Sequence, residues 1–109
     1  MKRFCFALDL HDDPGMIAEY DEWHKKVSAE IKESITSTGI TVMDIYRVGN
    51  RMFMIVEAHD DFSLEDKSMK DAANPAVQKW EKLMWKFQKP LPFARDGEKW
   101  MLMKQIFGL

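Results

Sequence analysis

The chain has 109 residues, the length of one ordinary domain and too short for two independent cores. Its residues are 46% hydrophobic and 31% charged, a balance that argues against both a disordered chain and an integral membrane protein. The formal charge of -2, with scattered basic residues, offers no basic surface to nucleic acid. We therefore expect a single soluble domain over residues 1–109.

The sequence also indicates a cellular compartment. No apolar run approaches the roughly 20 residues that a membrane-spanning helix needs. The apolar stretch from Phe4 to Leu8 is too short for a secretory signal. The single cysteine, Cys5, can form no internal disulfide, which is compatible with a reducing environment. We expect a cytoplasmic protein, and we interpret its nine methionines mainly as adaptable core side chains.

The first predicted elements are a strand and a helix. Residues 3–10 alternate with period two, as a strand with one buried face does. Asp13 and Pro14 are typical of a helix start, and Gly39 is typical of a helix end. An apolar stripe at steps of three and four residues predicts one long helix between them, facing a sheet. The stripe consists of Ile17, Tyr20, Trp23, His24, Val27, Ile31 and Ile35.

A hairpin is predicted next. Residues 41–47 and 52–58 are rich in β-branched and aromatic side chains and flank Gly49-Asn50, a pair suited to a two-residue turn. This turn sets the register and turns one set of side chains toward the helices. The expected pairs are Arg47 with Met52, Ile45 with Met54 and Met43 with Val56. We expect a second subunit to cover the opposite face, which carries Asp44, Tyr46, Val48, Arg51, Phe53, Ile55 and Glu57.

The rest of the chain completes the predicted fold. A short helical stretch follows Asp60-Asp61 and ends near Lys70. Asn74-Pro75 repeats the cap-plus-proline signal and starts a helix that ends near Phe87. Residues 99–107 are again strand-like, with two apolar faces. The resulting order, β-α-β-β-α-β, predicts a ferredoxin-like α+β fold.

Tyr20 and His24 are the first candidates for chemistry. They are four residues apart, so on a helix their polar ends lie close together inside an otherwise apolar stripe. Histidine as a residue type titrates near neutral pH and can move a proton to or from a bound substrate. The alternative is a structural histidine at the edge of the core, with one ring nitrogen on a backbone carbonyl. Spacing alone leaves both interpretations open.

Two further features have a structural alternative. Trp80 could present its indole to the C–H groups of a sugar ring, or it could be a core residue, as most aromatic side chains are. His11-Asp12-Asp13 has side chains that bind metals, but it precedes a helix, where an acidic cap is expected. No further ligands are spaced to complete a site, so we predict no metal site.

In their order and spacing, several segments resemble the L-rhamnose mutarotase family, small ferredoxin-like proteins that dimerise into an α/β barrel. The resemblance runs nearly end to end, and no single motif carries it. The segments are Arg3-Phe-Cys-Phe-Ala-Leu, Tyr20-x-x-x-His24, Gly39-Ile40 with Ile45-Tyr46, Met52-Phe-Met-Ile-Val-Glu57, Asn74-Pro-x-Val-Gln-Lys-Trp80 and Met103-x-x-Ile-Phe-x-Leu109.

The resemblance implies a homodimeric, cofactor-free isomerase that interconverts the α and β anomers of a 6-deoxy-L-sugar, either L-rhamnose or L-fucose. It implies that His24 is the proton donor and that Tyr20 contacts a substrate hydroxyl. Trp80 matches the first residue of a tryptophan pair at the sugar site. Glu81 replaces the second tryptophan, and Met43 stands where a tyrosine is expected. These two replacements change which sugar hydroxyls find partners.

Two other functions fit the same predicted fold. One is a monooxygenase of the dimeric α/β-barrel class, with an aromatic substrate in a pocket between helices and sheet. The other is a non-catalytic module that binds a sugar or another small molecule in that pocket. Within the mutarotase hypothesis the general base stays open, with Tyr20, Glu81 and water as the choices.

Overall fold

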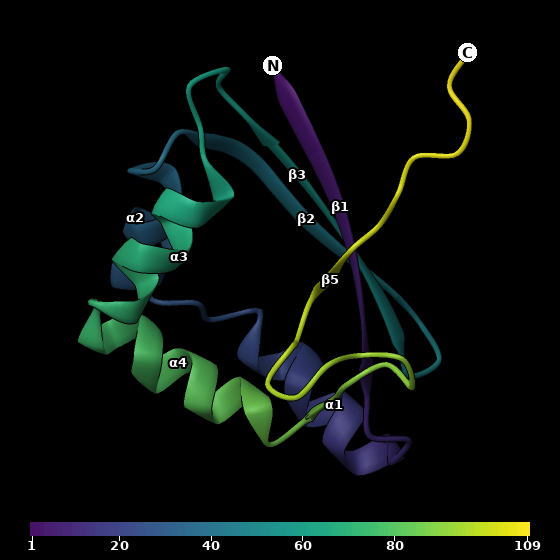
Figure 1. Cartoon of the computed structure of the whole chain (residues 1–109). Helices are drawn as coiled ribbons and strands as arrows, with labels where there is room; N and C mark the ends of the chain where they lie inside the picture. The colour runs from purple at the N-terminus through teal and green to yellow at the C-terminus, as the bar shows by residue number, and fades with distance from the viewer.

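The computed structural model describes residues 1–109 and consists of an antiparallel sheet with four helices on one side of it (Figure 1). The strands are β1 (Lys2–Leu10), β2 (Ile40–Val48), β3 (Arg51–Ala58), β4 (Gln88–Lys89) and β5 (Met101–Leu102). The helices are α1 (Pro14–Trp23), α2 (Ala29–Thr36), α3 (Leu64–Ala72) and α4 (Pro75–Trp85). The sheet order is β2-β3-β1-β4, and β5 also pairs with β1. This arrangement confirms the ferredoxin-like α+β class, and the sheet of one chain stays open.

The hairpin has the predicted turn and register. Gly49 adopts a φ of 57°, in the left-handed region that such a turn requires and that glycine tolerates. The three predicted pairs, Arg47 with Met52, Ile45 with Met54 and Met43 with Val56, are all present. Burial alternates along β3, whose buried residues are Met52, Met54, Val56 and Ala58. The predicted inward face of β3 is therefore confirmed.

The prediction of one long helix before Gly39 is wrong. The helix ends at Trp23, with His24 as its C-cap, and α2 begins after Ser28. The backbone of Ser28 is extended, and its Oγ accepts a hydrogen bond from the Ile31 N–H at 3.3 Å. A serine that satisfies a free N–H in this way favours a new helix start over continuation. The apolar periodicity runs across the break and so concealed it.

The two helices after the hairpin differ in how well their starts were predicted. Asn74 caps α4 as expected, since its Oδ1 accepts from the Ala76 N–H at 3.0 Å. In contrast, α3 begins later than Asp60-Asp61. Its cap is Ser63, whose Oγ accepts from the Asp66 N–H at 3.2 Å.

The last strand is much shorter than the predicted 99–107. Within this range only the two residues of β5 form a strand, which pairs with β1, and after Met103 the chain leaves the sheet and runs away from the body of the molecule (Figure 1). Ile106 and Phe107 stay exposed in this segment. Because strand formation depends on packing against neighbours, apolar composition alone does not hold these residues in the sheet.

The core lies between the sheet and the helices and has two parts. The first cluster consists of Leu8, Leu10, Tyr20, Met52, Met84 and Phe87. The second consists of Ile40, Met54, Val56, Ala58 and Phe62. Trp100 is half-buried and packs against both clusters, so it connects them. None of the four helices is long and apolar enough to cross a membrane.

Candidate active site

The first helix brings Tyr20 and His24 together. Asp13 caps α1 by accepting from the Met16 N–H at 3.0 Å, and Pro14 occupies the first turn. One turn apart at the other end of the helix, the rings of Tyr20 and His24 have their centroids 4.5 Å apart. Tyr20 is buried in the first core cluster, whereas His24 is half-buried. The helix therefore anchors the phenol and holds the imidazole at the edge of the core.

The His24 imidazole is fixed by one of its two nitrogens. Nδ1 lies 2.8 Å from the backbone carbonyl oxygen of Tyr20, and because a carbonyl only accepts, Nδ1 carries the hydrogen. In the neutral ring the lone pair is then on Nε2. Nε2 makes no hydrogen bond within the chain. It is not sealed from solvent either, because the one buried side-chain polar atom without a partner is Gln88 Oε1. The bond is the one a structural histidine makes, yet it leaves Nε2 open to a ligand.

Helix α4 contributes the residues that lie opposite His24. Val77 and Met84 are buried, and the positions between them on that side of the helix are Trp80 and Glu81. The indole of Trp80 meets the imidazole of His24 edge-on, with 5.6 Å between centroids and 73° between planes. Glu81 is half-buried beside it. An aromatic ring from the opposite helix thus lies against the imidazole, and the next residue along that helix carries a carboxylate.

A cavity of about 190 Å³ collects the five residues that the sequence analysis singled out. They are His24 and Tyr20 from α1, Trp80 and Glu81 from α4, and Met43 from β2. A single water needs only about 10–15 Å³, so this volume admits a small organic molecule. The lining is mainly apolar with a few converging polar groups, which is typical of small-molecule sites.

Other side chains also line this cavity, and those that the sequence did not single out include Lys67, Asp71, Gln88, Lys99 and Trp100. A signal existed for the first two, because Lys67 and Asp71 continue the face of α3 that begins with half-buried Leu64. No local pattern marks the other three. Gln88 lies in a strand of only two residues. Lys99 and Trp100 reach the cavity because the residues after them pair with β1 as β5.

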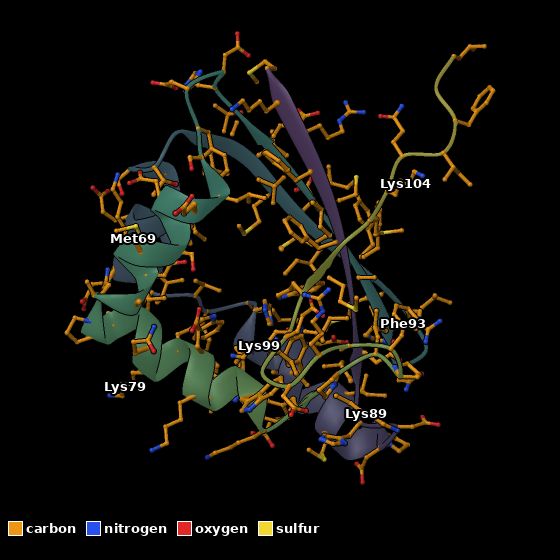
Figure 2. All side chains as sticks on the ribbon, in the orientation of Figure 1. Met69, Lys79, Lys89, Phe93, Lys99 and Lys104 are labelled. Atoms are coloured by element: carbon orange, nitrogen blue, oxygen red, sulfur yellow. The ribbon has the colours of Figure 1, made fainter.

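Lys99 is already engaged by its surroundings. Figure 2 shows it where the C-terminal segment passes α4, and its Nζ donates to the Glu81 carbonyl oxygen at 3.3 Å. The same ammonium lies 4.8 Å from the ring centroid of Trp85. Burial lowers the pKa of Lys99, and the nearby Glu81 carboxylate partly opposes this effect. This lysine therefore fastens the segment to α4.

A buried hydrogen bond holds the Tyr20 phenol. Gln88 Nε2 donates to the Tyr20 oxygen at 3.1 Å. Burial raises the pKa of Tyr20 to about 12, although the bond from Gln88 works in the opposite direction. The phenol is therefore neutral at physiological pH, where it can donate a hydrogen bond but is a poor general base.

This raised pKa predicts a loss of stability in alkali. Between the ordinary value of 10.0 and the folded value of about 12, the folded state holds a proton that the unfolded state has released. The contribution of this proton to the free energy of unfolding is therefore fully present below pH 10. It is lost as the pH rises toward 12, which lowers the free energy of unfolding by about 2–3 kcal/mol. We expect Tyr20→Phe to remove this fall, as measured by urea unfolding across that range. An unchanged alkaline loss in the variant would contradict the assignment.

The structure is thus a ferredoxin-like α+β protein with a cavity lined by an imidazole, an indole and a carboxylate. Residues 3–109 match the L-rhamnose mutarotase family. The chain belongs to this family and is an isomerase of the mutarotase class.

Individual relatives agree with this membership. The L-fucose mutarotase of Xanthomonas campestris pv. campestris is 42% identical over 100% of this chain and 89% of its own length. The L-rhamnose mutarotase of Phocaeicola vulgatus is 32% identical over 73% of each protein. The crystal structure of an L-rhamnose mutarotase from Formosa agariphila has a TM-score of 0.74 at 20% identity, covering 100% of this chain and 99% of that chain. This last similarity supports the fold.

Proposed function

We propose that the chain interconverts the α and β anomers of a 6-deoxy-L-sugar, with L-fucose preferred over L-rhamnose. The observation that carries the proposal is the His24 ring, with Nδ1 fixed by a carbonyl and Nε2 free beside the Trp80 indole in the cavity. The order of the sugars rests on the relatives. The protein named as an L-fucose mutarotase is similar over the whole chain, whereas the one named as an L-rhamnose mutarotase is less similar over 73% of it.

Ring opening requires one proton to be delivered and one to be removed. In the proposed mechanism, protonated His24 donates its Nε2 proton to the ring oxygen as the bond from that oxygen to C1 breaks. The anomeric hydroxyl gives its proton to a base, and its oxygen becomes that of the open-chain aldehyde. Rotation about the C1–C2 bond and closure on the other face, with both proton transfers reversed, produce the other anomer.

The remaining cavity residues have separate roles in this proposal. Tyr20, kept neutral by a pKa of about 12, contacts a sugar hydroxyl and is not the base. The anomeric proton then goes to Glu81 or to a water molecule beside it. Trp80 packs against the C–H groups of the sugar ring. Met43 adds an apolar wall from β2, suited to the methyl group of a 6-deoxy sugar.

We also propose that the chain works as a cytoplasmic homodimer. On the sheet face away from the helices, Tyr46 and Val48 are 60% and 79% exposed, and Ile106 and Phe107 of the C-terminal segment are exposed too. A second copy would cover these side chains and close the open sheets into a barrel. The free thiol of Cys5 suits a reducing compartment. Light scattering tests the assembly, and the mass of a single chain would contradict it.

Anomer-exchange NMR tests the activity directly. Saturation transfer between the α and β anomeric protons of L-fucose and of L-rhamnose is measured with and without the purified protein, at near-neutral pH and low buffer concentration. We expect faster exchange of both sugars with protein, and a larger acceleration for L-fucose. No acceleration for either sugar would contradict the proposal. Tight sugar binding without acceleration would assign a binding module.

A further inference from the structure

We propose that Lys67 and Asp71 of α3 form a second polar subsite of the cavity, which binds the two adjacent ring hydroxyls that lie farthest from the anomeric carbon of the sugar. The inference rests on the proposed mutarotase function. It assigns part of the sugar specificity to a helix that carries none of the residues discussed for proton transfer.

The pair is well formed and faces the cavity. Lys67 Nζ donates to both carboxylate oxygens of Asp71 at 2.6 Å, and the two side chains are only 14% and 19% exposed. Both line the 190 Å³ cavity and an adjoining hollow of about 430 Å³. The two hollows also share Glu81, Lys99 and Trp100, so they form one cleft with the ion pair at their junction.

Helix stability does not explain this pair. Its order, with the base first and the acid last, is the less favourable one, because Asp71 lies in the last turn of α3, where the helix dipole disfavours negative charge. The same helix carries a second pair with the favourable order. Asp66 and Lys70 are 3.0 Å apart, and their side chains are 58% and 57% exposed. The outer pair, Asp66 and Lys70, thus stabilises the helix, and the inner pair, Lys67 and Asp71, needs another explanation.

Burial does not explain the inner pair either. On the inward face of α3, Leu64 is followed at helical spacing by Lys67 and Asp71, where an amphipathic helix normally carries apolar side chains. Removing two charges from water costs about as much as their attraction returns, so a hydrophobic pair there would be at least as stable. Charges held at this position are available to a polar ligand.

The hydrogen-bonding capacity that remains matches a pair of hydroxyls. A carboxylate accepts at about four positions and an ammonium donates three hydrogens. The mutual contact of Lys67 and Asp71 uses one position on each oxygen and two N–H groups. Each carboxylate oxygen can still accept from one sugar hydroxyl, and the third N–H can donate to one of the hydroxyl oxygens. Neighbouring hydroxyls on one ring satisfy all of these groups.

The fold places this subsite away from the imidazole. In Figure 1, α4 runs from α3 toward α1. His24 meets α4 at Trp80, whereas Gln78 ties α4 to the end of α3 by donating to the Asp71 carbonyl oxygen at 2.9 Å. In a six-membered sugar ring, C3 and C4 lie opposite the ring oxygen and C1. A sugar with its reacting atoms at His24 therefore turns its 3- and 4-hydroxyls toward α3.

Two matched substitutions on one helix test the subsite. Asp71→Asn should raise the KM for L-fucose by about 10- to 100-fold and change kcat little, because the contact is made equally in the ground state and the transition state. Asp66→Asn changes the outer pair in the same way and should leave both constants unaltered. Circular dichroism and thermal unfolding of both variants establish that they are folded.

Deoxy sugars separate binding from a merely structural role. The wild-type protein should lose kcat/KM with 3-deoxy- or 4-deoxy-L-fucose, and Asp71→Asn should lose much less on the same change, since the residue and the hydroxyl form one interaction. The subsite proposal would be contradicted if the losses were additive for both analogues, or if Asp71→Asn had the same KM as an active wild type. Either result would leave the proposed function standing. A wild-type chain without exchange activity would overturn the proposed function and the subsite with it.

Discussion

Replacing His24 by alanine is expected to lower the rate constant for anomer exchange at saturating sugar by about 10²- to 10⁴-fold, the usual contribution of a general acid. The ring is half-buried, and the backbone N–H of His24, which donates to the Glu22 carbonyl and closes α1, stays in place. We therefore expect the variant to fold. Exchange NMR with L-fucose measures the rate, and thermal unfolding checks the fold.

A second histidine provides the control. His11 is exposed in the loop before α1 and does not line the cavity, so His11→Ala should retain the wild-type exchange rate. Full activity in His24→Ala would remove the proposed mechanism. A variant that loses stability but keeps its rate would identify His24 as a structural histidine, held for its bond to the Tyr20 carbonyl.

Much of the fold was predictable because its signals are local. Gly49-Asn50 between two alternating runs determines the hairpin and its register, and Asn74-Pro75 determines the start of α4. The break at Ser28 was not, because the apolar periodicity continues through it and tertiary packing decides between one helix and two. Residues 99–107 have the composition of a strand, but most of them find no edge of the sheet in this chain.

The candidate site was predictable in part. Helical spacing paired Tyr20 with His24, and Trp80 was a candidate with a core alternative, whereas the family resemblance pointed to Glu81 and Met43. The structure brings all of these into one cavity. The ion pair of α3 was missed because charges on a short helix usually face solvent, and only the position of α3 against α4 turns it inward.

Core packing is expected to have a large effect on the free energy of unfolding, and two methionines allow a matched comparison. Met52→Ala is expected to lower the free energy of unfolding by about 2–5 kcal/mol, whereas Met69→Ala should change it by less than about 0.5 kcal/mol. The chemical change is the same, but Met52 is 1% exposed in the first core cluster, and Met69 is 66% exposed on α3 (Figure 2). Denaturant unfolding at neutral pH measures both values.

The same substitution connects stability with the site. Met52 lines another hollow together with Tyr20 and His24, so the space left by Met52→Ala lies directly beside the helix that holds the imidazole. A loss of several kcal/mol is a large part of the roughly 5–15 kcal/mol that stabilises a domain. We therefore expect a lower exchange rate in folded Met52→Ala as well. If the two alanine variants proved equally stable, the sheet and helices would not pack as described, and the cavity between them would lose its basis.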